Sequence, residues 1–216
     1  MDNQSTKQKI LNTALDLFST QGFDATSVSQ IADEVGIRKA SVYSHFKSKQ
    51  EILESLMQEV MKQYEWHSIF SKSNRDKSSF LTDEKDLNVS SVTQAIIGQI
   101  RYIIHEPQMA KARKFLTIEQ FRNPALAKVQ TKQNYTNVMD YFVALIEFLI
   151  WQKKLSDGDF QIMAAQLCLP VSVWLNLCDR EPEREDEVIS LIERHVRQFF
   201  KMYAADSIMK AKAARL

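Results

Sequence analysis

The sequence predicts an all-α protein of about nine helices, with an N-terminal three-helix domain followed by a larger helical domain. Apolar residues recur with a helical period along most of the 216 residues, and no stretch alternates convincingly as a strand would. The chain has only four glycines and four prolines, which disfavours a β-rich or disordered protein. These observations together predict helices packed against helices.

Composition excludes several other classes of protein. The net charge is +1, so any affinity for nucleic acid must come from a local cluster of basic residues. Cys168 and Cys178 are the only cysteines, which is too few for a disulfide framework and fits a reducing compartment. The N-terminus lacks an apolar signal-peptide core, and the most apolar run, Tyr141–Trp151, is too short to cross a bilayer. We therefore expect a cytoplasmic protein that does not associate with membranes.

The first helix is expected to begin after Ser5, which can cap it together with Gln8. Gly22 ends the helical pattern. The residues expected to be buried share one face of this helix: Ile10, Leu11, Ala14, Leu15 and Phe18. This helix would brace the two short helices that follow.

The next stretch, residues 26–49, reads TSVSQIADEVGIRKASVYSHFKSK. Its first helix carries an apolar stripe, and Ser27 with Gln30 forms a capping box ahead of that stripe. Gly36 stands where the chain needs a positive φ to turn sharply. A second short helix follows at about residues 38–46, and its Val42 and Phe46 can face inward. This is the pattern of a helix-turn-helix.

The open face of that second helix predicts contact with DNA. Residues 38–49 contain four basic residues and no acidic residue, and a helix of this size fits the major groove. The candidates for phosphate contacts are Ser27, Tyr43 and Lys49. The candidates for base edges are Arg38, Lys39, Ser41 and His45. The alternative is a charged helix face that only water covers.

The stretch from Ile10 to about Leu53 resembles the tetracycline-repressor (TetR/AcrR) family of bacterial regulators. The resemblance rests on ALDLF with GF, TSV with IA, GI with SVY, and HFKSK with IL. It implies a DNA-binding domain at residues 1–47 and a ligand-binding and dimerisation domain at 48–216. It also implies a homodimeric repressor on a near-palindromic operator, released by an unknown small apolar or amphipathic effector that shifts the helix beginning at Ser48.

Periodicity predicts the remaining elements in order. A long helix begins after the Ser48–Glu51 capping box, and a polar loop spans residues 71–91. Further helices are expected at about residues 92–105, 109–121, 124–152, 160–177 and 185–205, with a basic tail after the last. Pro170 should kink the helix that contains it.

The last two long helices carry more apolar residues than a monomer surface allows, and the family resemblance implies that they form a four-helix bundle with a second copy. The expected dimer interface consists of Leu169, Val173, Leu177, Val188, Leu191, Ile192, His195 and Phe199. The alternative is that both helices simply complete the core of one chain.

A ligand cavity in the second domain is expected from the resemblance alone. The candidates for its lining are Tyr102, His105, Phe115, Glu119 and Trp174, although aromatic residues at helical spacing are also typical of a core. One rival function is a regulator controlled by a protein partner instead of a small ligand. A helical enzyme is a further rival, but the four histidines are dispersed and stand in no metal-binding or catalytic motif. We expect no catalytic residue, metal or other cofactor.

Overall fold

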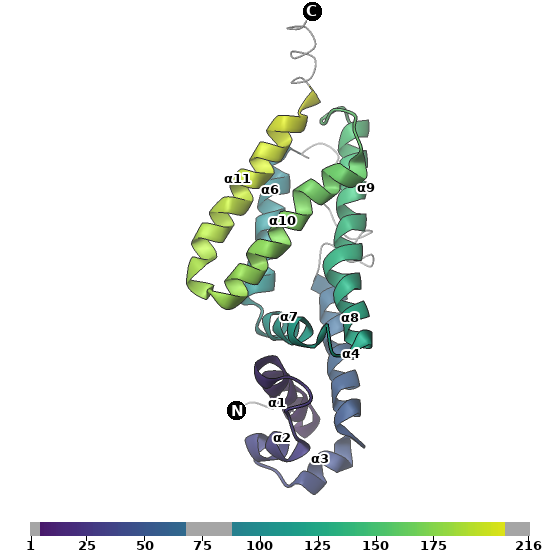
Figure 1. Ribbon diagram of the computed structural model, residues 1–216, viewed down its shortest axis with the longest axis vertical. Coiled ribbons are helices and arrows are strands. Elements are labelled where there is room, and N and C mark those ends of the chain that lie inside the picture. The colour runs from purple at the N-terminus through teal and green to yellow at the C-terminus, as the bar shows by residue number, and fades with distance from the viewer. Residues whose placement is uncertain (1–4, 68–87, 206–216) are drawn as a thin grey trace, which may run out of the picture. The chain divides into compact units, whose positions relative to one another are not determined.

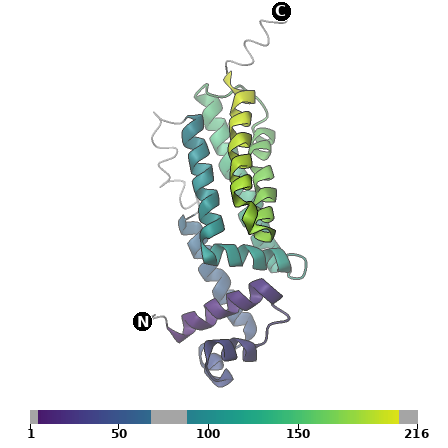
Figure 2. The same ribbon diagram turned by 90° about the vertical axis from the view of Figure 1, so that its left-hand side faces the viewer.

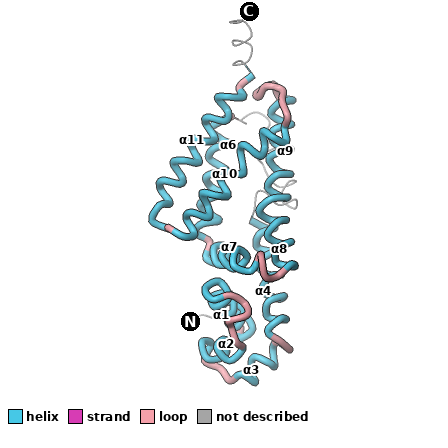
Figure 3. The backbone as a smooth tube through the Cα atoms, viewed as in Figure 1, coloured by secondary structure: helices cyan, strands magenta, loops and turns pink. Residues whose placement is uncertain are grey.

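The computed structural model describes residues 5–67 and 88–205, and within these ranges every regular element is a helix (Figure 3). The β-type pairing in the described part is an isolated bridge between Leu155 and Ala204. The all-α prediction is confirmed. The basic tail and most of the expected loop at 71–91 lie outside the described residues, and residues 89–91 belong to a helix.

The chain divides into two compact units. The first contains the chain up to His67 together with His105–Gln130, and the second contains the segment ending at Ile104 and the chain from Thr131 onward. The first unit thus includes residues 49–67 and 105–130 in addition to the 1–47 domain that we expected.

Three helices open the first unit: α1 (Thr6–Gln21), α2 (Val28–Val35) and α3 (Lys39–His45), as Figure 1 shows. Ser5 caps α1 by accepting a hydrogen bond from the backbone N–H of Gln8 at 3.2 Å. All five apolar residues expected on the inner face of α1 are buried, which confirms that prediction.

The first unit continues with α4 (Lys49–His67), α7 (Pro107–Glu119) and α8 (Pro124–Thr131). Both α4 and α7 contact α1, and they also contact each other. Helix α7 begins at Pro107 instead of after it, because proline suits the first helical position, where no N–H is needed. Ser48 caps α4 as expected, but the Glu51 side chain accepts from the N–H of Lys47 and not of Ser48.

The second unit contains α6 (Val89–His105), the π-helical segment η2 (Lys132–Thr136), α9 (Asn137–Trp151), α10 (Phe160–Arg180), the short 3₁₀ segment η3 (Pro182–Arg184) and α11 (Glu185–Tyr203). The expected helix at 124–152 is helical throughout, but η2 separates α8 from α9. Residues of α6, α9, α10 and α11 share one hydrophobic core, and Figure 2 shows these helices extending along the unit.

Helix α10 has two different faces. Met163, Leu167 and Val171 belong to the core, as do both cysteines, and burial raises the pKa of the Cys168 thiol to about 12. The opposite face exposes 55% of Ile162 and 63% of Val173 to solvent. By length and composition alone α10 could span a membrane, and one of its faces packs into the hydrophobic core of the second unit. The described residues therefore leave one apolar face of α10 uncovered.

Candidate nucleic-acid interface

The turn between α2 and α3 has the geometry that a helix-turn-helix needs. Gly36 adopts φ 76° and ψ 34°, the left-handed conformation that glycine tolerates best. Its N–H donates to Asp33 C=O at 3.1 Å, and the N–H of Ile37 donates to Ala32 C=O at 2.9 Å. This pair of bonds is a Schellman motif, which satisfies the last carbonyls of α2 and redirects the chain into α3.

The side chains of α3 divide into a buried anchor and an exposed face. Val42 is fully buried and Phe46, the residue after the helix, is 2% exposed, as the sequence predicted. The opposite face exposes Tyr43, which is 46% exposed, and the side chains of three further candidates: Arg38, Lys39 and His45. Ser41 is half-buried between the two faces. Three of the four candidate base-reading side chains are thus exposed to solvent, and none is in the core.

The predicted capping box at the start of α2 is present. The Ser27 hydroxyl oxygen accepts from the N–H of Gln30 at 3.1 Å, and the Gln30 side-chain oxygen accepts from the N–H of Ser27 at 2.8 Å. Ser27 is exposed, and its hydroxyl can still donate its own hydrogen. That donor is available to a phosphate oxygen.

Lys49 is placed differently from the other candidates. Its ammonium donates to the carbonyl oxygens of Phe23 at 2.7 Å and Thr26 at 2.8 Å, and it lies 3.5 Å from that of Asp24. It also lies 4.2 Å from the centre of the Phe23 ring, a cation–π contact. An ammonium has three N–H donors, so these carbonyls occupy all of them. Lys49 binds the loop between α1 and α2, and a phosphate contact would require one of these bonds to break.

This geometry agrees with comparisons to known proteins. Residues 10–56 match the family model described as bacterial regulatory proteins, tetR family. Over these residues the chain is similar to the tetR family. The match covers α1, α2, α3 and the beginning of α4, which are the elements that build the exposed face of α3.

Two curated relatives from this family are similar over part of the chain. The biofilm operon icaADBC HTH-type negative transcriptional regulator IcaR of Staphylococcus aureus is 39% identical over 77 residues, which are 36% of this chain and 40% of that protein. The HTH-type transcriptional regulator SrpR of Pseudomonas putida is 22% identical over 152 residues, 70% of this chain and 64% of that protein. The chain thus spans 40% of the length of the first of these relatives and 64% of the second.

Solved structures share the fold across both units. SmeT, the repressor of the Stenotrophomonas maltophilia multidrug efflux pump SmeDEF, has a TM-score of 0.64 at 20% identity, with 94% of this chain and 93% of that chain covered. The same protein has been solved in complex with triclosan, with a TM-score of 0.64 at 21% identity. At this level of identity the likeness establishes the tetR fold and no more.

The five residues that we expected to line a ligand cavity do not lie together. Phe115 is fully buried in α7 and stacks on Phe18 of α1 with ring centres 5.6 Å apart. Glu119, also on α7, is 2% exposed and accepts from the N–H of Phe23 at 2.9 Å. Both therefore pack inside the first compact unit, whereas Trp174 belongs to the second.

The other three candidates occupy separate positions. Tyr102 is half-buried in α6, and His105 is exposed at its end. Trp174 of α10 makes an edge contact with His195 of α11 at 5.4 Å between ring centres. The family resemblance led us to expect a cavity, but it did not show which helix each of these residues would meet.

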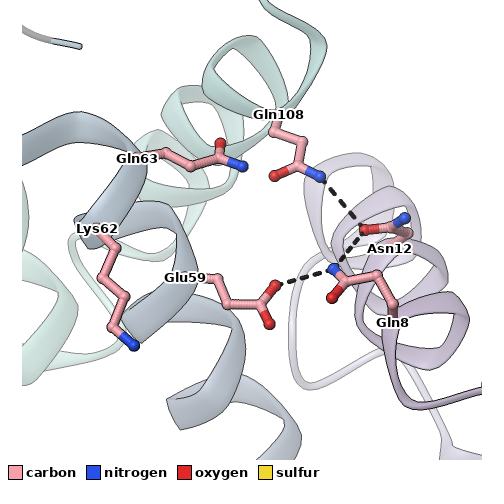
Figure 4. A pocket seen from close by; sticks show the side chains of 6 residues that line it. All are labelled: Gln8, Asn12, Glu59, Lys62, Gln63 and Gln108. Atoms are coloured by element: carbon pink, nitrogen blue, oxygen red, sulfur yellow. Dashed lines mark hydrogen bonds between the residues drawn. The ribbon is translucent and has the colours of Figure 1, made fainter. Parts of the chain in front are cut away.

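The first unit contains a hollow of about 430 Å³ that the sequence did not predict (Figure 4). Six polar side chains from α1, α4 and α7 line it: Gln8, Asn12, Glu59, Lys62, Gln63 and Gln108. Gln8 bridges two of these helices by donating to Asn12 at 3.3 Å and to Glu59 at 2.9 Å. Ligand cavities are usually lined by hydrophobic and aromatic side chains, and none of these six residues is of that kind, so this hollow does not match the cavity that we expected for an apolar effector.

The expected dimer residues divide by exposure. Val188 and Ile192 are fully buried in the core of the single chain, and Phe199 is 1% exposed, so none of the three has surface to offer a partner. The other five retain exposed surface: Leu169, Val173, Leu177, Leu191 and His195. Periodicity could not separate the inner stripe of α11 from an outer one, because both follow the same helical repeat.

Proposed function

We propose that this tetR-family chain is a transcriptional repressor that binds a near-palindromic DNA operator as a homodimer. The observation that carries the proposal is the exposed face of α3, where Arg38, Lys39 and His45 point to solvent while Val42 anchors the helix. A short helix held in this way can enter the major groove, and its basic side chains can bind guanine edges and phosphates. The regulatory sign follows IcaR, which is named a negative regulator.

The dimer is supported by the uncovered face of α10. Val173 and Ile162 expose most of their apolar side chains there, and Leu169 and Leu177 continue the same face. Burying this surface against a second copy is favourable at roughly 25 cal/mol per Å² of apolar surface. A two-fold dimer would present two α3 helices about 34–36 Å apart, one turn of the DNA helix.

Release by a small apolar or amphipathic molecule is the regulatory part of the proposal. The structure of SmeT with triclosan supports it, because a protein of this fold binds a compound of that kind. An effector that binds the released state about 100-fold better than the DNA-bound state would shift the equilibrium by about 2.7 kcal/mol.

The test of DNA binding begins with selection of bound duplexes from a random library by the wild-type protein. Fluorescence anisotropy then compares the wild type with R38A/K39A on the selected duplex. We expect at least a tenfold loss of affinity and relaxed base preference, since each good base contact contributes about 1–3 kcal/mol. The control is K114A/K128A, which removes the same charge from exposed positions on α7 and α8.

Equal losses in the two double variants would mean that overall charge, not α3, drives binding. If the wild type enriches no sequence, the proposed function is wrong.

The dimer is tested separately with Val173→Glu. This places a charge on the exposed apolar face of α10 without disturbing the core, since Val173 is 63% exposed. Light scattering should give the mass of a monomer for the variant and of a dimer for the wild type. A variant that stays dimeric would exclude this face as the interface.

A further inference from the structure

The loop between α1 and α2, residues 22–26, is held by two helices that come from distant parts of the sequence. From α7, Glu119 Oε1 accepts a hydrogen bond from the N–H of Phe23 at 2.9 Å. From α4, Lys49 Nζ donates to the C=O of the same residue at 2.7 Å and to that of Thr26 at 2.8 Å. The N–H and the C=O of Phe23 are thus each bound by a different helix.

The approach of Glu119 to this loop depends on Gly22. Gly22 has φ 87° and ψ 168°, a conformation that is nearly exclusive to glycine. A Cβ at this position would lie 2.9 Å from Glu119 Oε1, closer than real Cβ contacts. The sequence therefore has the one residue that permits both the backbone geometry and the close contact with the buried carboxyl group.

Helix α7 is aligned with α1 along its whole length. Gln108 donates to Asn12 at 3.4 Å, Lys111 forms an ion pair with Asp16, and Phe115 stacks on Phe18. Residue numbers rise together in these pairs, so the two helices run in the same direction. Glu119 is the last residue of α7 and makes the final contact of the series, on the loop itself.

The loop leads directly into the DNA-binding elements. Thr26 is 1% exposed, and its hydroxyl donates to Gly22 C=O at 2.8 Å, which closes the loop on itself. The next residue is Ser27, which caps α2, and α2 packs against α3. A displacement of the Phe23 peptide is therefore passed to the start of α2 within four residues.

We infer that Glu119 is a positioning residue for DNA binding: it anchors the α1–α2 loop to α7, so that the placement of α2 and α3 depends on where α7 lies. The inference rests on the proposed function. Glu119 itself touches no DNA in this role. It acts through the Phe23 peptide. A movement of α7 would therefore displace the α1–α2 loop, and with it α2 and α3.

The test uses three variants of the full-length protein. Glu119→Leu keeps the size of the side chain but removes the acceptor, Glu119→Gln retains an acceptor oxygen at the same reach, and Glu119→Asp draws the oxygen back by one methylene. Glu147→Leu on α9 makes the same chemical change at an exposed site and serves as the control. Thermal unfolding first establishes the temperature range in which each variant is folded.

Hydrogen exchange measured by mass spectrometry reports on the loop directly. The Phe23 amide should exchange at least tenfold faster in Glu119→Leu than in the wild type, and Glu119→Gln should restore its protection. Unchanged exchange in Glu119→Leu would overturn the inference. Should Glu119→Leu fail to fold, Glu119→Asp must show the faster exchange instead, and its failure to do so would equally overturn the inference.

DNA affinity on the library-selected duplex is the second readout. We expect a loss of about tenfold in Glu119→Leu, near wild-type affinity in Glu119→Gln and Glu147→Leu, and an unchanged salt dependence, because no phosphate contact is removed. If Glu119→Leu exchanges faster but binds DNA as the wild type does, Glu119 is only structural. If the wild type binds no duplex, the proposed function fails, and the DNA role of Glu119 falls with it.

Discussion

The proposed DNA-binding face and the α1–α7 contact are both in the first unit, yet they are built in opposite ways. The exposed face of α3 is formed by residues that are close together in sequence, and its Arg38, Lys39 and His45 side chains are exposed to solvent. The α1–α7 contact joins residues 96 positions apart, and Phe115 and Glu119 in it are almost completely buried. Side chains of the first kind can change with little loss of stability, whereas those of the second kind hold the unit together.

Lys49 shows that sequence alone does not tell whether a basic residue lies on the exposed face or makes internal contacts. By sequence it belongs to the basic cluster that ends at residue 49, and by contacts it belongs to the internal support of the α1–α2 loop. We therefore expect the same substitution to affect stability and DNA binding differently at an exposed lysine and at a lysine that makes internal hydrogen bonds.

The largest effect is expected at Phe115. Replacement by Ala should lower the free energy of unfolding by about 3–5 kcal/mol, because it removes a fully buried ring and leaves a cavity against Phe18. Urea unfolding followed by circular dichroism measures this. The control is Phe121→Ala, since that ring is 91% exposed and its loss should change stability by less than about 0.5 kcal/mol. Similar losses of stability in both variants would contradict the distinction between buried contact residues and exposed residues of the first unit.

An intermediate effect is expected at Lys49. Replacement by Ala should lower stability by about 1.5–3 kcal/mol, the usual contribution of hydrogen bonds that involve a charged group. It should also weaken DNA binding without changing the salt dependence. The exposed Lys47 should behave in the reverse way: its replacement leaves stability unchanged and, if it binds a phosphate, lowers the salt slope by about one unit. A reduced slope for Lys49→Ala would restore it to the phosphate contacts.

The smallest effect is expected at Gly36. Its replacement by Ala should cost about 1–2 kcal/mol from the left-handed backbone alone, since no atom lies within 4 Å of the added Cβ. Gly98 in α6 has equally open surroundings but helical geometry, so Gly98→Ala should stabilise the protein by roughly 0.5–1 kcal/mol. Thermal unfolding distinguishes the two, and a loss at both positions would show that the added methyl group, not the backbone conformation, is responsible.

Much of the first unit could be predicted from sequence because its determinants are local. The capping box of Ser27 and Gln30, the turn at Gly36 and the inward Val42 each depend on residues a few positions away. The second unit was predicted less well. Helix positions were close to those observed, but Val188, Ile192 and Phe199 were assigned to a dimer interface and lie in the core of the chain itself.

The sequence by itself determined the approximate positions of the helices, the apolar face of α1 and α2, and the basic side chains around α3. Those features follow from capping, backbone conformation and helical period, all of which act within a few residues. Only the tertiary structure decided that Lys49 and Glu119 bind the α1–α2 loop and that Phe115 packs on α1. The pattern of apolar and polar residues on a helix does not show which distant segment will pack against it. The hydrogen bond between Glu119 and Phe23, 96 residues apart, could therefore be seen only in the structure.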